Sequence, residues 1–146
     1  MIADEELTAA NNKIPYNDSK IKYEGAWQTR ISSGFQSTVG GVKQSAASVA
    51  AGSTAEFSFT GTGFGIKGYT SKSQGEFKVA YKGYEETVNC FEADSIDNSF
   101  GALVYTSFEV PAGTHTVIIT ALGEKNIYLD EFLINGTLAE IGRAHV

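Results

Sequence analysis

The residues most able to carry catalytic chemistry are few in this sequence. The one cysteine, Cys90, lies in a strand-like run, and the only histidines are His115 and His145. A nucleophilic cysteine needs a nearby histidine and an orienting group, so we favour a buried thiol that packs as a small hydrophobic group. No Gly-x-Ser-x-Gly, His-Glu-x-x-His or phosphate-loop motif occurs, and no carboxylate spacing marks an acid–base pair. We therefore predict that the protein is not an enzyme.

Asp130 is the most informative charged residue. Within a strand it shares the face of Phe132 and Ile134, because side chains alternate across a sheet. A carboxylate on an apolar face must be hydrogen-bonded or paired. If the terminal strands are neighbours, three residues could donate to it: Tyr23, Trp27 and His115. We favour a structural network for Asp130, and a ligand or calcium role stays as the alternative.

Size and charge exclude several classes of protein. The 146 residues suffice for one domain with one core. A formal net charge of -6 argues against a nucleic acid or an anionic membrane as partner, because both attract cationic surfaces. No apolar run approaches the roughly 20 residues that span a bilayer. A single cysteine excludes an internal disulfide and argues against a structural zinc site.

The middle of the chain is a series of short apolar runs separated by turn residues, a pattern typical of an all-β sandwich. Lys82-Gly83 is predicted to form a hairpin turn, and residues 34–48 and 92–101 are predicted to be long loops. We expect no helix and about eight strands, at residues 21–28, 55–60, 64–69, 76–82, 86–91, 102–110, 114–122 and 127–134. A jelly roll is the topology that we favour.

The two ends differ from the middle. Residues 1–20 form a predicted N-terminal extension that lacks the apolar core of a signal peptide. Residues 137–146 are predicted to be a C-terminal extension or a remainder of the expression vector. The β-sandwich domain is therefore expected over residues 21–136.

Several motifs, in this order along the chain, resemble the galactose-binding-domain-like jelly rolls. They cover residues 21–134: Ile21-x-Tyr23-x-Gly25-x-Trp27, Phe57-Ser58-Phe59-Thr60-Gly61-Thr62-Gly63-Phe64, Gly75-Glu76-Phe77-Lys78-Val79, Pro111-Ala112-Gly113-Thr114-His115-Thr116-Val117, Leu122-Gly123-Glu124-Lys125-Asn126 and Leu129-Asp130-Glu131-Phe132. Such domains are attached as ancillary carbohydrate-binding modules to bacterial glycoside hydrolases, esterases and surface proteins.

The resemblance implies a non-catalytic module that targets an extracellular enzyme or surface protein to a glycan. Its partners would be a poly- or oligosaccharide and covalently linked parent domains, at the cell surface or outside the cell. The alternative is a structural or adhesion module of a multidomain surface protein with no sugar site, because one fold hosts many functions.

The resemblance also implies which residues bind the sugar. Aromatic rings would contact the C–H face of a pyranose, and fixed polar groups would hydrogen-bond its hydroxyls. The predicted carbohydrate-binding residues are Trp27, Tyr69, Lys72, Tyr105 and Asp130. Trp27 also fits a place in or at the end of the core, with its indole N–H bonded to a neighbour. Tyr69 fits a plain surface role equally well, and Tyr105 a sheet face.

Calcium is the one metal that the resemblance raises. Some relatives carry a Glu-rich calcium signature at the N-terminus, and here the only acidic run before Ile21 is Asp4, Glu5 and Glu6. These residues lack the alternating ligand spacing of a calcium loop. We therefore predict no cofactor, and a structural calcium ion is left open.

Overall fold

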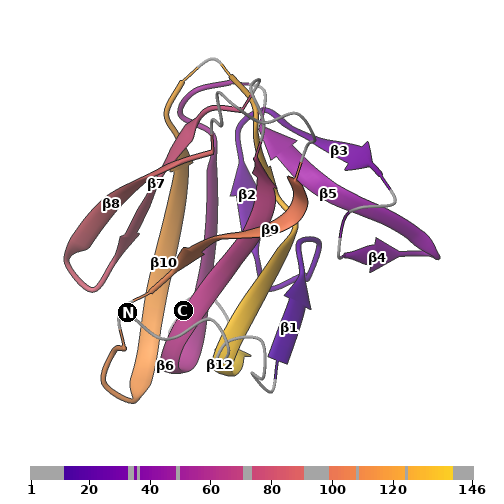
Figure 1. Ribbon diagram of the computed structural model, residues 1–146. Coiled ribbons are helices and arrows are strands. Elements are labelled where there is room, and N and C mark those ends of the chain that lie inside the picture. The colour runs from indigo at the N-terminus through magenta and orange to yellow at the C-terminus, as the bar shows by residue number, and fades with distance from the viewer. Residues whose placement is uncertain are drawn as a thin grey trace.

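The computed structural model describes residues 12–32, 35, 37–48, 50–70, 74–90, 99–107, 109–123 and 125–139. These residues form an all-β sandwich, without a helix in the described ranges (Figure 1). Twelve strands are present where about eight were expected: β1 (Asn12–Pro15), β2 (Lys22–Glu24), β3 (Trp27–Ile31), β4 (Thr38–Val39), β5 (Val42–Ser48), β6 (Thr54–Thr70), β7 (Glu76–Tyr81), β8 (Tyr84–Asn89), β9 (Ser99–Thr106), β10 (Gly113–Ala121), β11 (Ile127–Leu129) and β12 (Glu131–Ala139). The predicted fold class is confirmed. The described residues contain no helix with the length and apolar character needed to cross a membrane.

The long strand β6 passes from one layer of the sandwich to the other. The ring centroids of Phe57 and Phe64 are 5.7 Å apart, although seven residues of straight strand would separate their backbones by about 23 Å. The strand therefore bends sharply between these two residues. The bend lies at residues 61–63, as the pairing with β12 shows. Asn135 pairs with Gly63 and Gly136 pairs with Gly61, so Thr62 has no partner in the register of the two strands.

Glycine is required at this fold in the strand. A Cβ atom on Gly61 would collide with the carbonyl oxygen of Asn135, and one on Gly136 would collide with that of Thr60. Gly136 also has a φ of 143°, which disfavours any residue with a side chain. The two predicted strands at 55–60 and 64–69 are thus one strand with a sharp corner.

Two layers enclose the core. In the first layer the N-terminal half of β6 pairs with β10, followed by β7 and β8, while β2 and the end of β12 lie on its other side. In the second layer the C-terminal half of β6 pairs with β9 and with the start of β12, and β1 lies outside β12. The core between them contains completely buried phenylalanines: Phe57, Phe59, Phe64, Phe77 and Phe132.

A smaller sheet contains β5 between β3 on one side and β4 and β11 on the other. The prediction of a long loop at residues 34–48 is wrong here, because β4 and β5 form a hairpin around Gly40 and Gly41, with φ values of 58° and 82°. The alanine- and serine-rich sequence of β5 has low β-propensity, but Ala46 and Ala47 are buried, and packing overrides that preference.

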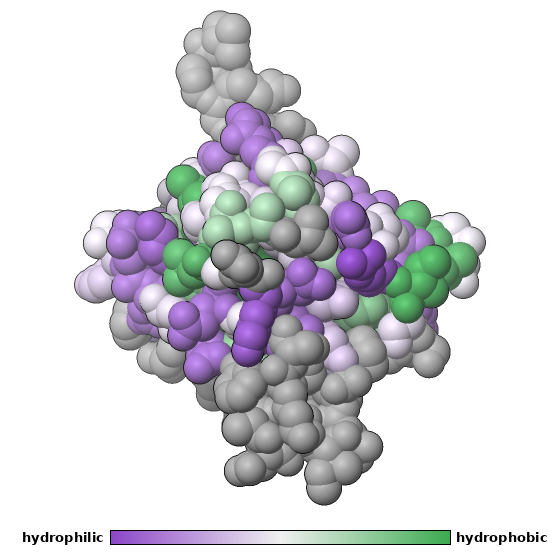
Figure 2. All heavy atoms as spheres, turned by 90° about the horizontal axis from the view of Figure 1, so that it is seen from above, coloured by the Kyte–Doolittle hydropathy of each residue, from purple (hydrophilic) through white to green (hydrophobic). Residues whose placement is uncertain are grey.

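Figure 2 shows a group of hydrophobic side chains on the side of the molecule where β3, β4 and β5 lie in Figure 1. Ile31, at the end of β3, is 71% exposed, and Val42 is also exposed.

Two predicted strands are interrupted near this sheet. Gly25, with a φ of 105°, separates β2 from β3, and Asp130 separates β11 from β12.

Candidate functional site

Asp130 lies where the chain passes from the smaller sheet into the sandwich, and it is completely buried. Its Oδ1 atom accepts the backbone N–H of Ser37 at 2.9 Å. The Ser37 hydroxyl and the N–H of Tyr16 donate to the Asp130 carbonyl oxygen, and the Asp130 N–H donates to the carbonyl of Lys67. This is a network within the fold, and the Ser37 N–H, which donates to the carboxylate, was not among the three donors expected from the sequence.

Trp27 is half-buried at the edge of the core. Its indole Nε1–H donates to the carbonyls of Glu24 at 3.0 Å and Thr54 at 3.1 Å. Its ring meets Tyr23 edge-to-face at 5.1 Å. Burial, followed by the charge of Tyr16, raises the pKa of Tyr23 well above its usual value. Trp27 therefore packs against the core with its N–H satisfied, and its predicted contact with a sugar stays a prediction.

Tyr69 is buried near the end of β6. Its ring meets Tyr128 edge-to-face at 5.0 Å, and Tyr128 stacks on Phe35 at 5.8 Å. The backbone of Tyr128 passes close to Gly68, and only glycine fits there, because a Cβ atom on Gly68 would lie 2.5 Å from the Tyr128 carbonyl oxygen. Lys72 lies outside the described residues.

Tyr105 lies in a different part of the molecule. It points into the sandwich from β9, and its hydroxyl is 2.7 Å from that of Tyr81. Burial raises the pKa of Tyr105 well above its usual value, and hydrogen bonds with Tyr81 and Glu86 add to the effect. The structure thus gives Trp27, Tyr69, Tyr105 and Asp130 different sets of neighbours.

The surroundings of Tyr105 form a hollow between the layers. Strand β8 ends the first layer, β9 ends the second on the same side, and a hollow of about 260 Å³ lies between them. Its lining residues are Glu86, Thr87, Val88, Leu103, Val104, Tyr105 and Thr106. We call the group of Tyr81, Tyr84, Glu86 and Tyr105 the tyrosine edge. It combines aromatic rings, hydroxyls and one carboxylate at an open side of the sandwich.

Tyr84 is the exposed member of the tyrosine edge. It is 54% exposed, and its ring centroid is 6.4 Å from that of Tyr81. In β8 it shares the face of Glu86, two residues further on. An exposed ring beside a carboxylate can bind a ligand that has both an apolar face and hydroxyl groups. The carbohydrate-binding residues predicted from the sequence include neither Tyr84 nor Glu86.

A tight hairpin places Tyr84 at the end of its strand. Tyr81 pairs with Tyr84 across the turn, and Lys82 and Gly83 have φ values of 49° and 80°. Positive φ at both central residues defines a type I′ turn, which matches the twist of the two strands. The predicted hairpin turn at Lys82-Gly83 is confirmed. An aromatic residue directly after such a turn was the available signal for this site.

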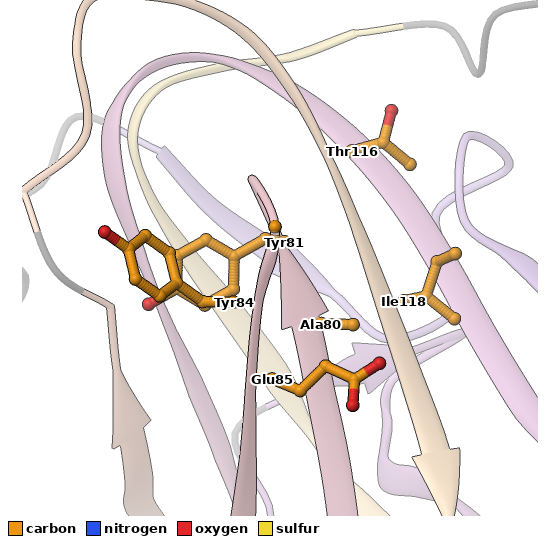
Figure 3. Close-up of a pocket in the computed structure, with 7 residues that line it drawn as sticks. Ala80, Tyr81, Tyr84, Glu85, Thr116 and Ile118 are labelled. Atoms are coloured by element: carbon orange, nitrogen blue, oxygen red, sulfur yellow. The ribbon is translucent and has the colours of Figure 1, made fainter.

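The same hairpin has a second hollow on its other face. The hollow has a volume of about 480 Å³. Its lining residues are Ala80, Tyr81, Gly83, Tyr84, Glu85, Thr116 and Ile118. Tyr81 and Tyr84 border it at the turn, and their rings lie on the other side of the hairpin from the side chains of Glu85 and Ile118 (Figure 3). The two faces of the hairpin are therefore chemically different.

The cysteine and the histidine considered for catalysis, Cys90 and His115, are held within the fold. Cys90 is completely buried, and a ring nitrogen of His115 is 2.7 Å from the Pro111 carbonyl oxygen. In the part of the chain that the structure describes, no group of three or more metal-ligating side chains occurs.

Comparisons with known proteins give similar folds only among solved structures. No family model and no curated protein matches the sequence. A family two carbohydrate esterase from Cellvibrio japonicus matches over 87% of this chain, with 16% identity and a TM-score of 0.59. A xanthan lyase from Paenibacillus matches over 91%, with 14% identity and a TM-score of 0.56. An exo-β-1,3-galactanase from Phanerochaete chrysosporium, solved with galactose, matches over 86%, with 14% identity and a TM-score of 0.56.

Each match covers only a part of the neighbouring protein. This chain spans 34% of the esterase, 29% of the galactanase and 13% of the lyase. It therefore corresponds to a part of each of these carbohydrate-active proteins. At such low identity the likeness concerns the fold alone, and it agrees with the all-β jelly-roll sandwich expected from the sequence.

Proposed function

We propose that this protein is a non-catalytic carbohydrate-binding module that holds a larger extracellular protein at a glycan. The observation that carries the proposal is the tyrosine edge, where the exposed ring of Tyr84 lies on the same face as the Glu86 carboxylate. The fold matches support it, because each covers most of this chain and only 13% to 34% of a carbohydrate-active protein.

Each group of the tyrosine edge has a role in this proposal. The Tyr84 ring contacts the C–H face of a pyranose, and the Glu86 carboxylate accepts hydrogen bonds from its hydroxyls. Tyr105 lines the hollow between β8 and β9, and the hydrogen bond between its hydroxyl and that of Tyr81 holds it in place. Affinity is modest, since one exposed ring and few polar groups make the contact.

Titration of the protein with neutral oligosaccharides, including β-1,3-galactotriose and cellohexaose, tests the proposal. We expect Tyr84→Ala to weaken binding about tenfold, because a ring contact contributes about 1.4 kcal/mol. Glu86→Gln keeps the size of the side chain and removes its charge, and we expect a smaller loss. Val42→Ala, at an exposed position of the smaller sheet, is the control.

The alternative is a structural module without a sugar site. It is favoured by the hydrogen bonds of Asp130 and Trp27, which serve the fold. Absence of binding across a broad panel of plant, microbial and host glycans, with the protein folded, would establish this alternative. Binding that is unchanged in Tyr84→Ala would instead reject the tyrosine edge as the site.

A further inference from the structure

The hollow on the outer face of the β7–β8 hairpin has a defined construction. A row of side chains crosses three strands there, because Ile118 pairs with Ala80 and Ala80 pairs with Glu85. A small residue between two long ones leaves a depression. Gly83, which also lines the hollow, adds no side chain on the side of the turn. The volume of about 480 Å³ lies in the range of small-ligand sites.

Ile118 is the unusual residue of this face. The other outward positions of β10 are threonines, at 114, 116 and 120. Threonine has the same branched shape and a similar β-propensity, so the strand itself does not require isoleucine. Ile118 is nevertheless 39% exposed to solvent. With Ala80 it gives the hollow an apolar floor on an otherwise polar face.

Hydrogen-bonding groups stand beside this floor. Lys78 Nζ lies 3.7 Å from Glu85 Oε2, and both side chains are partly exposed. This separation exceeds hydrogen-bonding distance, so the ammonium retains donors and the carboxylate retains acceptors for a ligand. The Thr116 hydroxyl, 2.8 Å from that of Ser58, lies at another side of the hollow.

We propose that this hollow is a second glycan contact, which takes one neutral pyranose with adjacent hydroxyl groups. The C–H face of the sugar lies on Ile118 and Ala80. One hydroxyl donates to the Glu85 carboxylate, and its neighbour accepts from the Lys78 ammonium. The inference rests on the proposed function and extends it, because the hairpin then holds one sugar on each face and the module binds two glycan segments.

An amide NMR titration of the full chain with the neutral oligosaccharide panel tests this inference. We expect two separate groups of shifting signals, one around Ala80, Glu85 and Ile118 and one around Glu86 and Tyr105. Ile118→Thr should abolish the first group of shifts and leave the second, because it keeps the branched shape that β10 already uses. Ile31→Thr is the same substitution at an exposed position of β3 and should change neither.

The variant Glu86→Ala separates this inference from the proposed function, because Glu86 lines the hollow between β8 and β9 and not this one. Shifts at Ala80 and Ile118 that persist in Glu86→Ala and disappear in Ile118→Thr support the second contact. Shifts confined to the tyrosine edge, and unchanged in Ile118→Thr, would overturn the second contact and leave the proposed function intact. No shifts with any oligosaccharide of the panel would overturn both.

Discussion

Two regions of this molecule use their polar and aromatic groups in opposite ways. Around Asp130 and Trp27, donors and acceptors are joined to each other and to the backbone within the fold. Beside the β7–β8 hairpin, Tyr84, Glu85 and Ile118 are exposed around the hollow of about 480 Å³, and Glu86 lines a second hollow. A polar group that is already bonded inside the fold contributes to stability, whereas one at a hollow can contribute to binding. Substitutions in the two regions should therefore separate stability from binding.

The largest effect is expected at Asp130. Asp130→Ala leaves the buried N–H of Ser37 without its carboxylate acceptor, and we expect a loss of about 3 kcal/mol in the free energy of unfolding. Chemical denaturation measures this loss. Asp130→Asn retains a carbonyl oxygen for the same N–H, so it should lose less. Equal losses of unfolding free energy in the two variants would contradict a stabilising hydrogen bond from the Ser37 N–H to the Asp130 side chain.

Trp27→Phe should have the next largest effect. It keeps an aromatic ring beside Tyr23 but removes the donor to the carbonyls of Glu24 and Thr54. We expect a loss of about 1–2 kcal/mol in the free energy of unfolding. Oligosaccharide affinity of the folded variant, measured by titration calorimetry, distinguishes the two roles of Trp27. A tenfold weaker affinity with unchanged stability would assign Trp27 to binding instead.

Alkaline pH should weaken the fold through one tyrosine in each region. The pKa values of Tyr23 and Tyr105 are raised in the folded protein, so above pH 10 the unfolded chain releases protons that the folded protein keeps. Stability then falls as pH rises, by up to about 1.4 kcal/mol per pH unit for each tyrosine. Denaturation at pH 9 to 11 measures the slope, and Tyr105→Phe should reduce it. An unchanged slope in that variant would contradict the burial of the Tyr105 hydroxyl.

The smallest effect is expected at the hairpin turn. Lys82 has a φ of 49°, a conformation that asparagine adopts at less cost than lysine. Lys82→Asn should therefore raise the free energy of unfolding by about 0.5–1 kcal/mol, measured by thermal or chemical denaturation. Lys82→Val, with a branched Cβ, should lower it. Oligosaccharide binding should be the same in all three proteins, since the Lys82 side chain lines neither hollow.

Much of the fold followed from local patterns, and its errors have physical causes. The alternation of apolar and polar residues predicted β7, and the glycine of Lys82-Gly83 predicted the turn that follows it. Strand β5 was missed because its small residues lack β-propensity and are held by burial between neighbours. The corner in β6 was read as a gap between two strands, since the pairing of Gly61 with Gly136 is a contact between distant parts of the chain.

The sequence by itself determined the class of fold, the acidic charge and the shortage of catalytic groups, because these depend on composition and on neighbours along the chain. It also determined that Asp130 shares the face of apolar residues. Only the tertiary structure decided that Ser37 bonds Asp130 and that Tyr105 meets Tyr81. These partners lie 93 and 24 residues apart. Such contacts depend on how strands are ordered in space, and side-chain alternation carries no information on that order.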